Sequence, residues 1–193
     1  ITMKKTVEFG HYFSKNNELR EIEWIILDEA PDGKKLLISK DCIEAMQYEY
    51  RENKNKDPKW ENCMIRLWLN NYFINSFFTV LEREKMYSVS HVLADLTPQE
   101  DKIILLSAEE AEKYLPNEND RKAKATQWAK RSQDGWRLYT EKGYCTWLLR
   151  DPSKLCEGNW TGVNSNGMLD LVGGDFYLSG QHGIRPVILV DMN

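Results

Sequence analysis

A segment near the C-terminus, residues 159–182, holds the residue types best suited to bind a ligand. A solvent-facing tryptophan with nearby amides or carboxylates can stack on a sugar ring and hydrogen-bond its hydroxyl groups. Trp160 stands in a glycine- and asparagine-rich setting of this kind, although burial in the core is the alternative for any tryptophan. The segment predicts a ligand-binding surface made of Trp160, Asn164, Asn166, Asp175, Tyr177, Gln181 and His182.

The titratable residues form no recognisable catalytic set. A general base must point at a substrate proton, and His182 is the histidine that could do so in this segment. The sequence identifies no residue that would orient His182, so a solvent-facing histidine without a functional role is the alternative. Glu109 and Glu110 resemble a carboxylate pair, but they belong to a capping box in which Glu110 reaches back to the Ser107 amide. We therefore expect no catalytic residue.

Arg150 and Arg185 lie in apolar, strand-like stretches near the expected centre of a sheet. A buried guanidinium needs a carboxylate partner to offset its desolvation, and Glu61, Asp170 and Asp175 are candidates. The sequence favours structural ion pairs, with recognition of an anionic ligand by one of the arginines as the alternative.

The spacing of cysteine and histidine predicts no metal site and no cofactor. The cysteines are Cys42, Cys63, Cys145 and Cys156, and the histidines are His11, His91 and His182. Four cysteines are too few to scaffold a domain of this size, and neither C-x-x-C nor H-E-x-x-H spacing occurs. We expect free thiols, with two disulfides as the alternative if the protein is exported.

The composition argues against nucleic acid and membranes as partners. The 193 residues include 26 basic and 30 acidic side chains, which give a formal charge of −4 and no basic stripe. No apolar run approaches the roughly 20 residues that span a bilayer, and the chain starts with polar sequence. We expect a cytoplasmic protein, with export after removal of a signal segment as the alternative.

The elements that position these residues are read from their periodicity. In the first half, we expect strands at 6–9, 21–27 and 35–39, a charged surface loop at 50–59, an amphipathic helix over 64–73 and a second helix near 79–86. In the second half, we expect a strand at 102–106, helices at 107–115 and 126–131, and strands at 144–150 and 184–190. Asn166-Gly167 predicts a tight hairpin turn with positive φ at both residues. The absence of a repeat or linker predicts one domain over 1–193.

Five short motifs follow one another along nearly the whole chain. They are Ile22-Glu23-Trp24, residues 60–70 (WENCMIRLWLN), residues 101–111 (DKIILLSAEEA), Trp147-Leu148-Leu149-Arg150 and Gly183-Ile184-Arg185-Pro186. Together they resemble a bacterial family of domains of unknown function in the C-type-lectin-like superfamily, from which the chain departs by having Asp151 where the pattern has serine. The resemblance implies an α+β fold, mainly antiparallel sheet with flanking helices and long loops, whose C-terminal loops often carry the ligand surface.

Two remoter resemblances define the alternatives for function. The Trp-Leu-x-Arg and Gly-x-Arg elements are similar to those of formylglycine-generating enzymes, which use a cysteine pair and copper, but Cys145 and Cys156 are more widely spaced here. Calcium-dependent lectins carry Glu-Pro-Asn and Trp-Asn-Asp motifs, and neither occurs in this chain. We therefore expect a non-catalytic module that binds a small molecule, a glycan or a protein through its C-terminal loops. An oxidase-like enzyme and a structural or assembly module are the alternatives.

Overall fold

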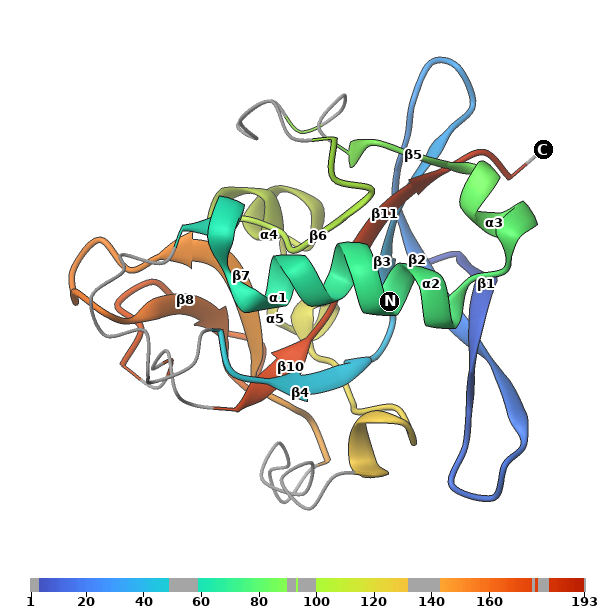
Figure 1. The fold of residues 1–193 in the computed structure, drawn as a ribbon. Coiled ribbons are helices and arrows are strands. Elements are labelled where there is room, and N and C mark those ends of the chain that lie inside the picture. Colours follow the sequence, from blue (N-terminus) through green and yellow to red (C-terminus); the bar gives the residue numbers. More distant parts are fainter. Residues whose placement is uncertain are drawn as a thin grey trace.

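Two mainly antiparallel sheets dominate the computed structural model, which describes residues 4–48, 59–89, 93, 100–131, 143–174, 176 and 181–192 (Figure 1). One sheet has the order β1-β2-β3-β11-β5, with β6 also paired to β11; the other has the order β4-β10-β7-β8-β9, in which only β10 and β7 run parallel. The first contains β1 (Thr6–Phe13), β2 (Leu19–Glu29), β3 (Lys35–Ser39), β5 (Met86–Tyr87), β6 (Ile103–Ile104) and β11 (Val187–Val190). The second contains β4 (Glu44–Met46), β7 (Trp147–Pro152), β8 (Trp160–Val163), β9 (Leu169–Asp170) and β10 (His182–Ile184). The mixture of strands and helices confirms the expected α+β class.

β1 and β2 form a long hairpin that projects at the lower right of Figure 1. Its turn is closed by a hydrogen bond from the Ser14 amide to the Glu18 carbonyl, and Asn17 takes the left-handed conformation with φ of 60°. The base of the hairpin is fixed by Trp24, which is fully buried and donates from Nε1 to the Phe9 carbonyl at 2.7 Å. The predicted opening strands are confirmed, and both are longer than the periodicity indicated.

The most prominent helix combines three helical segments without a break. They are α1 (Met64–Leu67), a π-helical segment (Trp68–Phe73) and α2 (Ile74–Phe77). The predicted amphipathic helix is confirmed, and Leu69 and Phe73 bury its apolar face. The other helices are α3 (Val80–Glu84), α4 (Ala108–Tyr114) and α5 (Glu118–Arg121), with short 3₁₀ turns at Trp60–Asn62 and Ala129–Arg131. The capping box of Ser107 and Glu110 is present, with amide-to-side-chain distances of 2.8 and 3.1 Å. None of the helices in the described part of the chain is long and apolar enough to cross a membrane.

Several elements differ from the sequence-based expectation: β7 begins at Trp147 and not at 144, β6 is shorter than 102–106, and only the 3₁₀ turn Ala129–Arg131 forms within the helix expected at 126–131. Three further differences have a specific physical reason. Met86 lies in β5 and not in a helix, because α3 ends at Glu84 and the chain then pairs with β11. The single strand expected at 184–190 is divided between the two sheets, because Pro186 has no amide to donate and breaks the ladder between β10 and β11. At the β8–β9 turn only Gly167 has positive φ, because a four-residue turn closes here.

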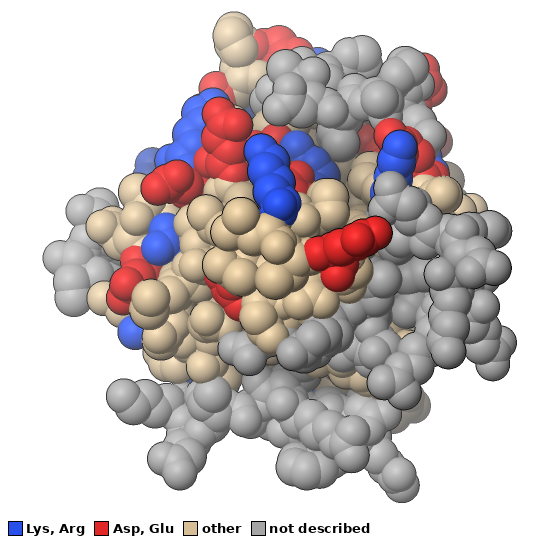
Figure 2. Space-filling view, turned by 90° about the vertical axis from the view of Figure 1, so that its left-hand side faces the viewer, with Lys and Arg blue, Asp and Glu red and all other residues tan. Residues whose placement is uncertain are grey.

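The strands of the sheet centre are apolar on both faces. Successive β7 residues alternate between two apolar clusters: Leu148 joins the cluster of Trp24, Phe73 and Trp160, whereas Trp147 packs with the cluster of Leu36, Cys42 and Val187. Strands covered on both faces lack the simple apolar–polar alternation of an exposed sheet. β7 and β8 lie at the left of Figure 1, on the side that faces the viewer in Figure 2, where uncharged residues make up much of the described surface.

Candidate functional site

Trp160, the centre of the predicted ligand surface, is a core residue. It begins β8, is 2% exposed and packs on the Tyr48 ring with 3.9 Å between ring centroids. Its Nε1 donates to the Arg150 carbonyl at 3.1 Å, and the Tyr48 hydroxyl donates to the same oxygen at 3.3 Å. The indole therefore has no open face for a sugar, and the core alternative describes it correctly.

His182 also points into the interior, which contradicts the expectation that it lines a surface cleft. It is 7% exposed, lies against Phe176 with 4.6 Å between ring centroids, and its Nδ1 is 3.3 Å from the Thr146 hydroxyl. Burial lowers the pKa of His182 from 6.5 to about 4, so the ring is neutral near pH 7. Among the described residues, its buried Nε2 has no hydrogen-bond partner.

The remaining predicted ligand residues divide into two groups. Asp175 and Tyr177 lie outside the described residues, whereas Asn166 is exposed and Asn164 and Gln181 are half-buried. Asn166 accepts a hydrogen bond from the Met168 amide at 3.0 Å and so helps to shape the β8–β9 turn. The structure places the asparagines on this turn and directs Trp160 and His182 into the core, so the predicted set does not share one surface.

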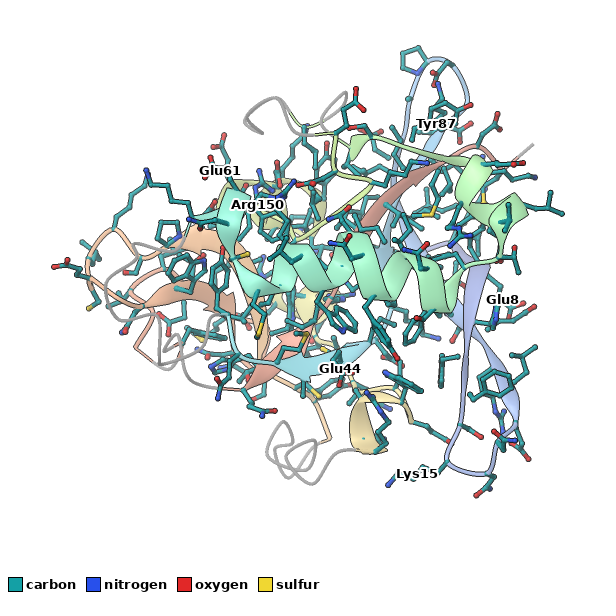
Figure 3. The ribbon with its side chains drawn as sticks, viewed as in Figure 1. Glu8, Lys15, Glu44, Glu61, Tyr87 and Arg150 are labelled. Carbon is teal, nitrogen blue, oxygen red and sulfur yellow. The ribbon has the colours of Figure 1, made fainter. Side chains whose placement is uncertain are left out.

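Arg150 forms the structural ion pair that the sequence favoured, but with a partner that the sequence did not identify. Its Nη2 lies 2.7 Å from Glu110 Oε1, Nη1 contacts the same carboxylate, and Nη1 also donates to the Leu105 carbonyl at 2.9 Å. Glu110 thus caps α4 and neutralises Arg150, which is labelled in Figure 3. The capping box gave the signal, because it fixed the position of the Glu110 carboxylate at the start of a helix packed on β7.

Arg185 differs from Arg150 because no salt bridge to a carboxylate is found for it in the described part of the chain. Its side chain is fully buried, lies 5.0 Å from the Trp147 ring, and donates to the carbonyls of Ser39 (2.8 Å) and Arg121 (3.2 Å). Burial lowers the pKa of Arg185 to about 10. Its Nη2 has no hydrogen-bond partner among the described residues.

Cys145 and Cys156, the pair that an oxidase would require, lie at opposite ends of β7. Cys145 precedes the strand by two residues and Cys156 follows it by four, so a strand of six residues, roughly 20 Å long, separates them. All four cysteines are free thiols. The oxidase alternative, which required a cysteine pair here, therefore loses its basis.

A pocket of about 290 Å³, which includes its open mouth, lies between the β1–β2 hairpin and the chain that follows β3. Its lining is Tyr12, Glu21, Ile22, Glu23, Lys40, Asp41, Ile43 and Thr126. Three carboxylates thus surround it, against one ammonium group. These residues do not stand out in the sequence by type or spacing. The crowding of carboxylates is visible only in the fold, where Glu8 and Glu23 lie directly opposite each other, and like charges in such positions are unfavourable.

The carboxylates of this pocket are unequally neutralised. Lys40 Nζ lies 2.9 Å from Glu23 Oε2, and the Asp41 carboxylate accepts from the Lys124 amide at 3.3 Å. The Glu21 carboxylate interacts with Glu8, whose pKa is raised by a hydrogen bond to Glu21 and by the charge of Glu21. Figure 3 shows Glu8 on this hairpin. The pocket therefore carries more negative charge than its own lysine balances.

Metal binding has no support in the described part of the chain, where no group of three or more His, Cys, Asp and Glu side chains could hold an ion. The polar clusters elsewhere are internally paired. Arg66 Nη2, for example, lies 2.7 Å from Asp101 Oδ1, and Trp60 Nε1 donates to Asp101 at 3.0 Å. The pocket at the hairpin is consequently the best candidate for a site.

Comparison with known proteins identifies one family. A family model described as a domain of unknown function (DUF6273) matches residues 32–192. No curated protein and no solved structure matches the chain.

Proposed function

Because the chain belongs to the DUF6273 family of domains of unknown function, its own geometry must indicate its role, and we propose a non-catalytic binding module for a small organic cation. The observation that carries this proposal is the pocket in which Glu21, Glu23 and Asp41 face a single ammonium group, that of Lys40. A C-type-lectin-like architecture and a cytoplasmic location remain parts of the same proposal.

The charge distribution favours a cationic ligand over a neutral or anionic one. Lys40 is already engaged by Glu23, so the net field at the pocket comes from Glu21, Asp41 and the neighbouring Glu8. A bound ammonium or guanidinium group would relieve the repulsion between Glu8 and Glu21. An anion would have to compete with three carboxylates for one lysine, and its binding is disfavoured on the same grounds.

The shape and the aromatic wall narrow the ligand further. The space of about 290 Å³ includes the open mouth, so the enclosed part is small and leaves room only for a small group. Tyr12 contributes a ring that burial partly shields from water, and the pKa of Tyr12 is accordingly raised. An aromatic face beside carboxylates is a favourable setting for an alkylammonium or guanidinium group. The proposed ligand is therefore a primary amine or guanidine with a short carbon chain.

The absence of a nucleophile–base pair in the pocket lining supports binding without catalysis. The lining holds no cysteine and no histidine, and its carboxylates are accompanied by a lysine that is itself paired with Glu23. Buried groups with unusual environments, such as His182 and Arg185, lie in the interior and not around this pocket.

Isothermal titration calorimetry with short diamines and agmatine tests the proposal, and a simple glycan and a small carboxylate anion complete the panel as comparisons. We expect saturable binding that weakens as salt rises, because the carboxylates at the pocket are partly open to solvent and their charges are screened. Glu21→Gln and Asp41→Asn should each weaken binding about fivefold or more, in keeping with the loss of a charged hydrogen-bond acceptor. Glu18→Gln, which removes one charge from the same hairpin but outside the pocket, serves as the matched control.

Two results would contradict the proposal. One is equal binding by Glu21→Gln, Asp41→Asn and the unchanged chain, which would locate the ligand elsewhere. The other is binding of only the glycan or the anion, with no binding of the cations, which would return the search to the exposed Asn166 of the β8–β9 turn.

A further inference from the structure

Four segments that are distant in the sequence close into a hydrogen-bonded ring around Gly183. The Cys42 amide donates to Lys124 (2.7 Å), and the Ile43 amide donates to Ile184 (2.8 Å). The Gly183 amide donates to Thr146 (2.9 Å), and the Cys145 amide donates to Ala123 (2.8 Å), which closes the ring. Figure 1 shows β4 and β10 side by side in this region, as their pairing requires.

The two cysteines of this ring face the same small interior. A Cβ atom added to Gly183 would lie 2.5 Å from Cys42 Sγ and 2.8 Å from the Thr146 carbonyl oxygen, so the Cys42 sulfur lies beside the chain that carries Cys145. Both cysteines are fully buried in one apolar cluster, and their side chains share a hydrogen bond. Glycine at 183 is what leaves room for the sulfur.

Arg185 supplies a second, independent observation at the same place. Its guanidinium is close enough to Cys42 for the two charges to interact, and its Nη2 is buried without a hydrogen-bond partner among the described residues. The Arg185 charge also interacts with the Asp41 carboxylate, and it favours the thiolate form of Cys42 when that thiol loses its proton.

From this arrangement we propose that Cys42 and Cys145 form a reversible redox pair that closes an intramolecular disulfide across the ring. Strands about 4.8 Å apart place diagonal neighbours of a four-segment ring roughly 7 Å apart. That separation lies just above the Cα distances, about 4.4–6.8 Å, that a disulfide tolerates, so the ring must contract slightly for the bond to form. Cys63 and Cys156 lie outside the ring and take no part.

The order of the steps follows from the shared hydrogen bond. Donation by the Cys42 thiol lowers the pKa of Cys145 and raises that of Cys42, so Cys145 is the first thiolate. The Cys145 thiolate attacks a small-molecule disulfide such as oxidised glutathione, and one glutathione thiolate leaves. Cys42 then loses its proton and attacks the Cys145 sulfur, releasing the second glutathione thiolate. Two protein thiols are thereby oxidised, and one disulfide oxidant is reduced to two thiols.

Thiol counting after equilibration with oxidised glutathione tests the pair. Because both sulfurs are buried, the reaction is run with and without mildly destabilising urea, which opens the segment to the oxidant. The oxidised chain is then unfolded in acid, alkylated and weighed. We expect two of the four cysteines to resist alkylation until a reductant is added, and proteolytic mapping to join the peptides that contain residues 42 and 145.

Matched variants separate this pair from the other thiols. Cys145→Ser should leave every remaining thiol open to alkylation, and Cys42→Ser should trap Cys145 as a mixed disulfide with one glutathione. Cys63→Ser and Cys156→Ser should still lose two thiols. The oxidised form should also unfold at a higher temperature, because the bond closes a long loop in the unfolded chain. The proposal is overturned if all four thiols stay reactive even in urea, if the link includes Cys63 or Cys156, or if oxidation lowers the unfolding temperature.

Discussion

His182→Asn isolates the energetic consequence of burying a neutral histidine. The side chain contacts Phe176 and Thr146, and its Nδ1 is the atom within hydrogen-bond distance of the Thr146 hydroxyl. Asparagine keeps a polar atom at the δ position, has no equivalent of the unpartnered Nε2, and does not titrate. The variant therefore removes the proton linkage while it preserves the contact with Thr146.

The magnitude follows from the depressed pKa of His182. The folded value is about 4, against 6.5 without burial, so in acid the unfolded chain takes up a proton that the folded chain refuses. Stability from this residue is complete above pH 6.5 and declines as the pH falls toward about 4. At 1.36 kcal/mol per pH unit, the loss across this window is about 3 kcal/mol.

Urea unfolding of the unchanged chain and of His182→Asn between about pH 7 and pH 4 measures the pH-dependent contribution of His182 to stability. The stability of His182→Asn is expected to be lower near neutrality because packing is lost, but the difference between the proteins should shrink by about 3 kcal/mol as the solution is acidified. Titrating carboxylates are common to both chains and cancel in the difference. His11→Asn, on partly exposed β1, is the control. Parallel pH profiles for the unchanged chain and His182→Asn would refute the argument.

Three further substitutions test the packing. Trp160→Ala should cost about 3–5 kcal/mol in urea unfolding because it empties a core site, whereas a cost below about 1 kcal/mol would restore its assignment to the surface. Glu110→Gln should cost a similar amount of stability, about 3–5 kcal/mol, because it leaves buried Arg150 without its ion pair. The control is Glu109→Gln at the exposed neighbouring position, which should change stability by less than about 0.5 kcal/mol. Equal effects of the two variants would count against the ion pair. Gly183→Ala should cost about 1–3 kcal/mol by displacing Cys42 Sγ, and a neutral result by thermal unfolding would show that the ring has room to spare.

Local rules predicted the elements whose signals lie within a few neighbouring residues. The amphipathic helix from Met64 and the capping box at Ser107 depend on short-range spacing, and both are present. The opening hairpin likewise follows from alternation on β1 and β2. The division at Pro186 was also readable in principle, since a proline removes one ladder donor, but the apolar run around it resembled a single strand.

The candidate site was not predictable in the same way, because its parts meet only through tertiary pairing. Glu21 and Asp41 are separated by a complete strand, and nothing in their local sequence indicates a shared pocket. Trp160 shows the opposite difficulty: glycine and asparagine neighbours suggested a surface, but strand pairing and the ring of Tyr48 place it in the core. The composition of the neighbouring sequence indicates that a residue lies near a turn or loop, but it does not show which side chains pack against that residue.

The motifs that resemble a known family hold strands and helices together in this fold. Trp147 Nε1 and Arg185 Nη1 donate to the same carbonyl, that of Arg121, and Arg150 joins β7 to α4 through Glu110. A family model that matches residues 32 to 192 extends over all of these contacts but begins after Tyr12, Glu21, Ile22 and Glu23. The family match can therefore account for the framework without including these four residues of the pocket. The acidic wall of the proposed cation site lies largely on the hairpin before the matched region, so the proposal predicts that cation binding is not shared by every member of the family.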